Sequence, residues 1–206
     1  MSERMVSGLQ RLDAPREVLE TARRVAEDEA RHVRICAHVL GALGFEAEVP
    51  SMSIPVLPER DDAFEQALVE LLVAGFAVAE TMSVGGFAAV RAIAREPLVR
   101  WAFAELARDE VRHGQFGELA SGWALRDWSA ERKRALWPVC VATMEDVERR
   151  AGGPVGARQN DARHEALEAL GVPGAATTGA ALLKSVPRWV LPRLARLGVI
   201  PDLPRA

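Results

Sequence analysis

Residue types that organise many small proteins are scarce or missing here. Tyrosine is absent, and the two cysteines, Cys36 and Cys140, lie far apart and form no CxxC pair. This excludes a disulfide framework, a zinc ribbon and a rubredoxin-type iron centre, and it favours a reducing compartment. No Asn-Gly or Asp-Gly pair marks a β-hairpin. Because Ala, Leu and Arg are abundant and β-branched runs are few, the composition predicts an all-α protein.

Long apolar runs and a strong net charge are also lacking. The longest apolar run, 67–79, is broken by Glu70 and is too short to cross a bilayer, and the first residues contain no apolar signal-peptide core. The net charge of −3 gives no reason to expect a nucleic-acid surface. We therefore expect a cytoplasmic protein with one well-filled core that binds neither nucleic acid nor membranes.

The spacing of apolar residues predicts four main helices. Their expected ranges are 3–12, 15–42, 63–94 and 97–126. Asp13 is the expected N-cap of the second helix. The apolar stripe of that helix is expected to contain Leu19, Ala22, Ala26, Val33, Cys36 and Leu40.

The rest of the chain has a different texture. A fifth helix is predicted from the segment 129–153, followed by a Gly-rich link and a short helix at 161–170. The apolar tail 181–201 is interrupted by prolines and is expected to dock on the helices or to form a subunit contact. We therefore divide the chain into a helical bundle at 1–126 and a C-terminal helical extension at 127–206.

One short motif occurs twice in this sequence. EDEARH at 27–32 and RDEVRH at 108–113 both contain Asp-Glu-x-Arg-His. Residues i and i+3 share a helix face, so Glu29 with His32, and Glu110 with His113, can each present one oxygen and one nitrogen ligand to a common point. A single copy is typical of surface ion pairs. Two copies on apolar stripes instead favour a site for iron or manganese.

A metal site between two such helices needs further carboxylates and support for its imidazoles. In four-helix di-metal bundles, a Glu from each of the other two helices completes the ligand set, and Glu80 in the apolar third helix is the expected one. Metal-bound histidines usually donate their second N–H to a carboxylate. We expect Asp28 to serve His113 and Asp109 to serve His32 across the bundle. Two arginines are expected to balance the charge, Arg31 and Arg112.

These motifs resemble the ferritin-like superfamily of di-iron carboxylate proteins, and in particular bacterial ferritin-like-domain proteins with Asp-Glu-x-Arg-His in helices two and four. The resemblance covers about residues 9–126 and rests on DAPREVLETARRVAEDEARHVRICAHVLGALG, AVAET and LARDEVRHGQFGELA. It implies an antiparallel four-helix bundle, here with a shortened first helix. It also implies a di-iron or iron–manganese centre that reacts with dioxygen, with Glu80 as the bridging Glu.

One ligand of the family pattern is not in its place. The family takes another Glu from its first helix, and its spacing puts that position before Met1; Glu3 is the nearest candidate but lies too far along the helix. Three explanations are open. The ligand lies upstream of Met1; or the site is altered, with five protein ligands and water or a substitute such as Glu145 or Glu148; or the scaffold has lost its metal.

The motifs and the resemblance together predict an oxidoreductase. We expect an O₂-dependent oxidase or oxygenase that acts on a small organic molecule, with two iron ions or iron and manganese held by Glu29, His32, Glu80, Glu110 and His113. An oxygenase would also need an electron donor. A homodimer is one candidate for the oligomeric state. The alternatives are a ferroxidase or iron-binding protein, and a metal-free ferritin-like scaffold.

Overall fold

The structure is a computed structural model, and it describes residues 2–46, 61–152 and 175–201. Every regular element in these ranges is a helix, which confirms the all-α prediction. In chain order the elements are α1 (Ser2–Arg11), α2 (Arg16–Ala42), α3 (Asp61–Glu70), η1 (Leu71–Glu80), α4 (Thr81–Ile93), α5 (Pro97–Ala124), α6 (Ala130–Arg134), α7 (Trp137–Gly152), α10 (Ala175–Ser185), η2 (Val186–Val190) and α11 (Leu191–Arg196).

The helix ends follow local signals, with two differences from the prediction. Asp13 does not cap α2; it adopts a left-handed backbone conformation with φ of 53° in the turn after α1, and Pro15 precedes the first turn of α2. The predicted fifth helix is divided into α6 and α7. Ser129 caps α6 by accepting a hydrogen bond from the Arg132 amide, and Pro138 lies in the first turn of α7, where its missing N–H costs nothing. The predicted helix at 161–170 lies outside the described residues.

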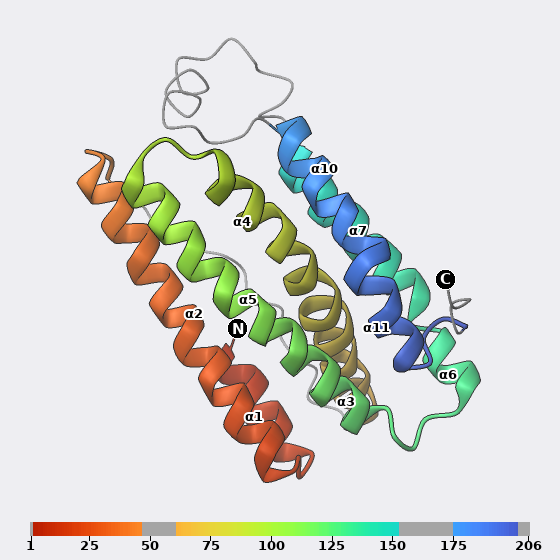
Figure 1. The fold of residues 1–206 in the computed structure, drawn as a ribbon. Coiled ribbons are helices and arrows are strands. Elements are labelled where there is room, and N and C mark those ends of the chain that lie inside the picture. The colour runs from red at the N-terminus through yellow and green to blue at the C-terminus, as the bar shows by residue number, and fades with distance from the viewer. Residues whose placement is uncertain (1, 47–60, 153–174, 202–206) are drawn as a thin grey trace.

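The long helices lie side by side as a bundle (Figure 1). Helices α3, η1 and α4 form one continuous rod that packs against α5, and α5 also packs against α2. The rod runs in the same direction as α2, and α5 runs antiparallel to both (Figure 1). Helix α1 packs on α2 and α3 at one end of the bundle.

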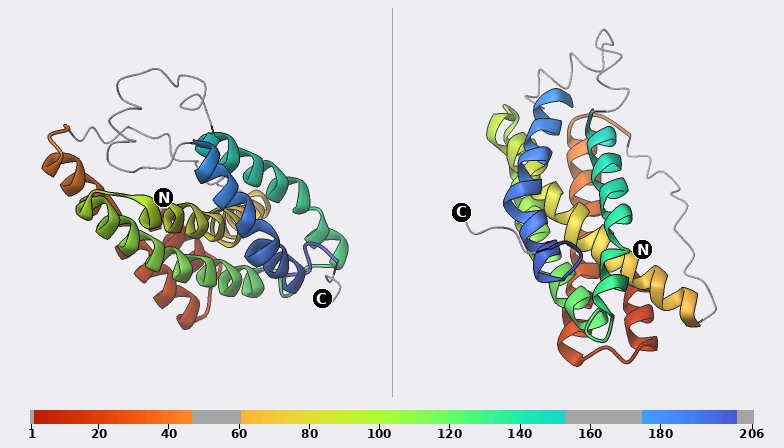
Figure 2. Two further views of the ribbon diagram at one scale, coloured as in Figure 1. Left: turned by 45° about the horizontal axis from the view of Figure 1, so that its top comes forward. Right: turned by 90° about the vertical axis from the view of Figure 1, so that its right-hand side faces the viewer.

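The C-terminal helices cover the side of the rod that faces away from α2. Helix α10 packs on α4 and α7, and α7 packs on η1. Figure 2 shows these helices along one side of the bundle, with α1 and α2 on the other. Helix α10 and the short segment η2 of the tail thus both contact α4.

The two largest apolar clusters join most of the helices. The first joins α1, α2, α3, η1 and α5, and consists of Met5, Leu9, Ala14, Val18, Ala22, Val25, Phe64, Leu68, Leu72, Phe76, Phe116 and Ala120. The second joins η1 and α4 to the C-terminal helices, and includes Val69, Val73, Ala77, Met82, Leu136, Cys140, Leu182, Val190, Leu194 and Leu197. The central rod is thus buried from both sides, and this explains its apolar composition.

One helix among the described residues, Ala63–Ile93, is long and apolar enough to cross a membrane by length and composition. Its mean hydropathy is 1.7, and 56% of its most apolar window is buried inside the protein. The rod is longer than the apolar run seen in the sequence because the helix continues through Glu70. Helices packed in a protein core have the same composition as membrane helices, and the two clusters above provide that core.

Candidate metal centre

The two copies of the repeated motif face each other across the contact between α2 and α5. Their histidine rings, His32 on α2 and His113 on α5, are both buried and have centroids 5.5 Å apart. Helical i, i+3 spacing places Glu29 beside His32 and Glu110 beside His113, as expected. The motifs therefore meet in the middle of the bundle rather than decorating its surface.

Three carboxylates converge on one nitrogen of His113. From His113 Nδ1 the distances are 3.2 Å to Glu29 Oε1, 3.3 Å to Glu110 Oε2 and 3.6 Å to Glu80 Oε2. Ligand atoms of Glu29, Glu80 and His113 all lie within 4.8 Å of one another, close enough to hold one metal ion. The protein therefore contains a partly to fully buried group of carboxylates and imidazole that could hold a metal ion.

His32 approaches the same carboxylates from the other helix. Its Nδ1 atom lies 3.9 Å from Glu29 Oε1 and 3.9 Å from Glu110 Oε1. Glu29 and Glu110 therefore lie between the two rings, and both rings direct Nδ1 toward them. This arrangement brings together all five residues expected as ligands: Glu29, His32, Glu80, Glu110 and His113.

The opposite ring nitrogens face aspartates of the partner helix. His32 Nε2 lies 3.0 Å from Asp109 Oδ2, and His113 Nε2 lies 3.5 Å from Asp28 Oδ2. This is the crossed pairing expected from the sequence. An aspartate that accepts a hydrogen bond from Nε2–H keeps a proton on that nitrogen, which would leave Nδ1 as the ring atom that binds a cation.

Two arginines lie around these aspartates. Arg31 donates to Asp109 and, at 3.1 Å, to Glu105 Oε2. Arg112 donates to Asp109 Oδ1 at 2.5 Å and to Asp28 Oδ2 at 3.2 Å. Asp109 therefore receives donors from both motifs. The positive charges of the two guanidinium groups compensate the negative charges of the aspartates. The three glutamates contact the imidazole rings instead.

Burial and mutual contacts shift the pKa values of the innermost groups. Burial raises the pKa of Glu110 to about 9, and the neighbouring Glu80 carboxylate acts in the same direction. Burial opposes protonation of His113, but its contacts with Glu110, Glu29 and Glu80 prevail and raise its pKa to about 12. Burial likewise works against a low pKa for Glu80, but contact with His113 outweighs it and lowers that pKa.

Several of these buried atoms have no hydrogen-bond partner. Among the described residues, Glu110 Oε2 and both ring nitrogens of His113 are buried without a hydrogen bond of acceptable geometry. Buried polar atoms are normally satisfied, because an unsatisfied one costs about 1–3 kcal/mol. Carboxylate oxygens and an imidazole nitrogen that converge without bonding one another fit a bound cation, which would satisfy all of them at once.

Glu80 reaches the cluster from an unusual helix. It is the last residue of η1, whose ten residues are π-helical. π-Helical turns are rare and often occur at functional sites. A π-helical turn holds more residues than an α-helical turn, so it rotates the residues that follow. At Gly117 the backbone of α5 comes so close to η1 that an added Cβ would lie 2.4 Å from the Ala77 nitrogen.

The other candidate ligands are not part of the cluster. Glu145 and Glu148 are exposed on α7, which packs on η1 and α10, and neither belongs to the described metal-ligating group. The side chain of Glu3 lies outside the described residues, although α1 is described. Cys36 is exposed on α2 and does not line the site.

The predicted apolar stripe of α2 was partly wrong. Val33 is 52% exposed, and Leu40 and Cys36 are also exposed. The face that packs inward instead consists of Val18, Ala22, Val25, His32 and Ile35. The helix is rotated so that His32, rather than Val33, points inward.

Comparison with protein-family models, with curated proteins and with solved structures gives no match. The site is therefore described from its own geometry.

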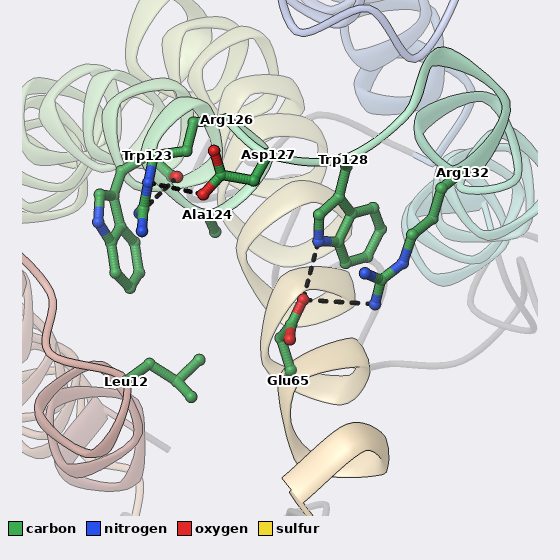
Figure 3. A pocket seen from close by; sticks show the side chains of 8 residues that line it. All are labelled: Leu12, Glu65, Trp123, Ala124, Arg126, Asp127, Trp128 and Arg132. Carbon is green, nitrogen blue, oxygen red and sulfur yellow. Dashed lines mark hydrogen bonds and ion pairs between the residues drawn. The ribbon is translucent and has the colours of Figure 1, made fainter.

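A separate cavity of about 300 Å³ lies near the ends of α1 and α5 (Figure 3). Trp123 and Trp128 line opposite sides of this cavity, and Glu65 lies below them in the view of Figure 3. Glu65 Oε1 accepts a 2.8 Å hydrogen bond from Trp128 Nε1, and Arg132 stacks over the Trp128 ring. No residue of the metal-ligating group lines this cavity, so it is distinct from the candidate metal centre.

Proposed function

We propose that this protein is a di-metal carboxylate protein of the ferritin-like type, an O₂-dependent oxidase or oxygenase that acts on a small organic molecule. The observation that carries the proposal is the convergence of three carboxylates on the Nδ1 atom of His113, which has no hydrogen-bond partner. Ion pairs on a protein surface do not require such burial.

The course of the chain supports the ferritin-like assignment. Helix α2 and the α3–η1–α4 rod, which follow one another in the chain order of described elements, run in the same direction (Figure 1). Ferritin-like bundles contain one such pair of consecutive parallel helices. The two copies of Glu-x-x-His lie on α2 and α5, and a Glu from the rod joins them, as in di-metal bundles.

The protein's own residues would have three tasks at the centre. Glu29, His32, Glu80, Glu110 and His113 would hold two iron ions, or iron and manganese. Asp109 bonds His32 Nε2 and fixes the orientation of that ring, and Asp28 lies 3.5 Å from His113 Nε2, where it would do the same for a metal-bound His113. Apolar side chains of the bundle would limit the entry of water.

Bound iron would supply the electrons with which dioxygen is reduced. A small organic substrate would then be oxidised at the centre, and an oxygenase would draw further electrons from a donor. Glu29, at 39%, is the most exposed of the five side chains, followed by Glu80 at 26%, and we assign substrate approach to the side of Glu29.

The decisive experiment is anaerobic reconstitution of the full chain with Fe²⁺, followed by elemental analysis and measurement of O₂ consumption. H113Q and H32Q remove the proposed ligands, and H38Q is a matched control because His38 is an exposed histidine on the same helix as His32. We expect close to two metal ions per chain in the wild type and in H38Q, and a loss of at least one in each of the other variants.

The alternatives give different results in the same experiment. Large iron loads in a high-mass assembly would indicate an iron-storage or ferroxidase protein. Iron bound at two per chain without substrate-dependent O₂ consumption would reject the oxygenase activity but keep the metal centre. No stoichiometric metal in the wild type would reject the proposal and leave a metal-free scaffold.

A further inference from the structure

The C-terminal helix α11 reaches the immediate surroundings of the metal centre. Its residue Arg193 is only 14% exposed and crosses to the rod and to α5. The guanidinium donates through Nη1 to the hydroxyl of Thr81 and, at 3.1 Å, through Nε to Glu118 Oε2. One side chain of the extension thus joins two helices of the bundle.

Both of these helices carry a candidate ligand next to the contact. Thr81 directly follows Glu80, and it is buried. Gly114 directly follows His113, and a Cβ added there would lie 2.7 Å from Thr81 Oγ1 and 2.8 Å from Arg193 Nη1. The guanidinium therefore fills the space that any side chain at position 114 would need.

The hydrogen bonds of Arg193 hold its guanidinium in one position. Glu118 compensates its charge and also accepts from Arg196 of the same helix. Hydrogen bonds from Arg196 and Arg193 lower the pKa of Glu118, which keeps it ionised as the partner of both. The buried Thr81 hydroxyl has Arg193 as its donor, so loss of that donor would leave the hydroxyl oxygen unsatisfied.

A second close contact sets the position of the C-terminal helices. At Gly85 on α4, an added Cβ would lie 2.7 Å from the carbonyl oxygen of Ala181 and 2.2 Å from Ser185 Oγ. Helix α10 therefore packs against α4 with almost no space between their backbones. This fixes the direction in which the chain leaves α10, and so the point at which α11 presents Arg193.

We propose that Arg193 is a positioning residue of the metal centre, which holds Thr81 against Gly114 and thereby sets the distance between Glu80 and His113. This inference rests on the proposed metal centre. It gives the C-terminal extension a task beyond covering the bundle, because the extension locks the two helices from which Glu80 and His113 project.

The test is a titration of the metal-free full chain with Co²⁺ under nitrogen, followed by the visible absorption bands of Co²⁺, whose energies and intensities depend on coordination geometry. R193M removes both donor contacts and R193K keeps only the charge. R196M is the matched control, because Arg196 lies on the same helix and also binds Glu118 but does not contact Thr81 among the contacts observed. T81V removes only the hydroxyl. Melting curves in EDTA report whether each variant is folded.

We expect R193M and T81V to bind Co²⁺ about tenfold to hundredfold more weakly than the wild type, with altered absorption bands, as found when groups that orient metal ligands are lost. R193K should fall between R193M and the wild type. R196M should keep the wild-type spectrum and affinity. If R193M does not fold, the T81V spectrum decides, because that substitution keeps the shape of the side chain.

Three results would overturn the inference in distinguishable ways. Wild-type spectra and affinities in folded R193M and T81V would show that Arg193 has no role in positioning, while the metal centre itself would stand. Failure of the wild type to bind Co²⁺ would reject the metal centre, and the positioning role with it. Equal weakening in R193M and R196M, with unchanged bands, would assign Arg193 to general stability instead.

Discussion

The two copies of the repeated motif have the same residues but different surroundings. On α2, Glu29 is 39% exposed and Asp28 is 15% exposed; on α5, the corresponding Glu110 is 5% exposed and Asp109 is 1% exposed. Helix α5 lies between α2 and the rod, and α11 touches it as well, whereas α2 lies at the edge of the bundle. The position of the helix, and not the motif, determines burial.

This difference divides the work between the copies. The α5 copy supplies the innermost groups, and burial raises the pKa of Glu110 to about 9. The α2 copy supplies Glu29, which reaches both the cluster and solvent. We infer that the α5 copy holds the centre in shape and that the α2 copy borders its entrance. The predictions below test that division.

The largest effect is expected from loss of the buried ring. H113L leaves Glu29, Glu80 and Glu110 without the imidazole they face, and removing one partner of a buried charged group costs about 3–5 kcal/mol. We expect metal binding to be lost and the free energy of unfolding in EDTA to fall by about 3 kcal/mol. H32L should cost less, because His32 Nδ1 faces two glutamates at 3.9 Å, whereas His113 Nδ1 faces three at 3.2–3.6 Å. Equal losses in urea denaturation would contradict the division.

The next largest effect concerns the close approach of α5 to the π-helical segment. G117A places a methyl group 2.4 Å from the Ala77 nitrogen, and backbone cannot move aside as a flexible side chain does. We expect a loss of about 2–3 kcal/mol. In the control G41A on α2, the added methyl meets no atom within 4 Å, and a gain of up to about 1 kcal/mol is expected. A harmless G117A would show that this contact does not position Glu80.

The paired aspartates give an intermediate effect. Asp109 receives donors from Arg31 and Arg112 and contacts His32, whereas Asp28 is more exposed. We expect D109N to lower stability by about 1–2 kcal/mol and metal affinity by about tenfold or more, with smaller changes in D28N. Chemical denaturation and Co²⁺ titration of both variants measure this. A larger effect of D28N would reverse the assignment of the inner copy.

The smallest effect is the contribution of Glu118 on α5 to the pH dependence of the free energy of unfolding. Hydrogen bonds from Arg196 and then Arg193 lower its pKa in the folded state below the ordinary value of 4.5. Its contribution is therefore fully present above pH 4.5 and is lost as the pH falls through the lowered value. We expect E118Q to be less stable than the wild type by about 0.5–1 kcal/mol at pH 7. That difference should shrink toward pH 3; a constant difference would contradict the ionic origin.

The sequence predicted the helices well, because their ends carry local signals. Pro97 opens α5 and Gly44 follows α2, and the observed bounds lie within a few residues of those expected. It also predicted which carboxylates and imidazoles would meet, since i, i+3 spacing fixes them on one helix face. The crossed contacts of Asp28 and Asp109 followed from the same repeat.

Other features had no signal in the sequence. The π-helical segment at 71–80 has an ordinary apolar composition, so nothing in its sequence indicates that its turns are wider than those of an α-helix. The face of α2 was misassigned because apolar residues occur on more than one side of that helix, and Val33 could fill the core as well as Ile35 by type alone. Packing against α5 buries Ile35 and His32 and leaves Val33 exposed.

By itself, then, the sequence determined the helical class of the protein, the limits of its main helices and the Glu-His pairs that share one helix face, because these depend on spacing along one chain segment. The tertiary structure decided which copy of the motif is buried, how Glu80 is turned toward His113, and that Arg193 lies beside them. These features depend on contacts between residues as far as 112 positions apart. Such contacts arise only when separate helices pack together, and no local pattern encodes them.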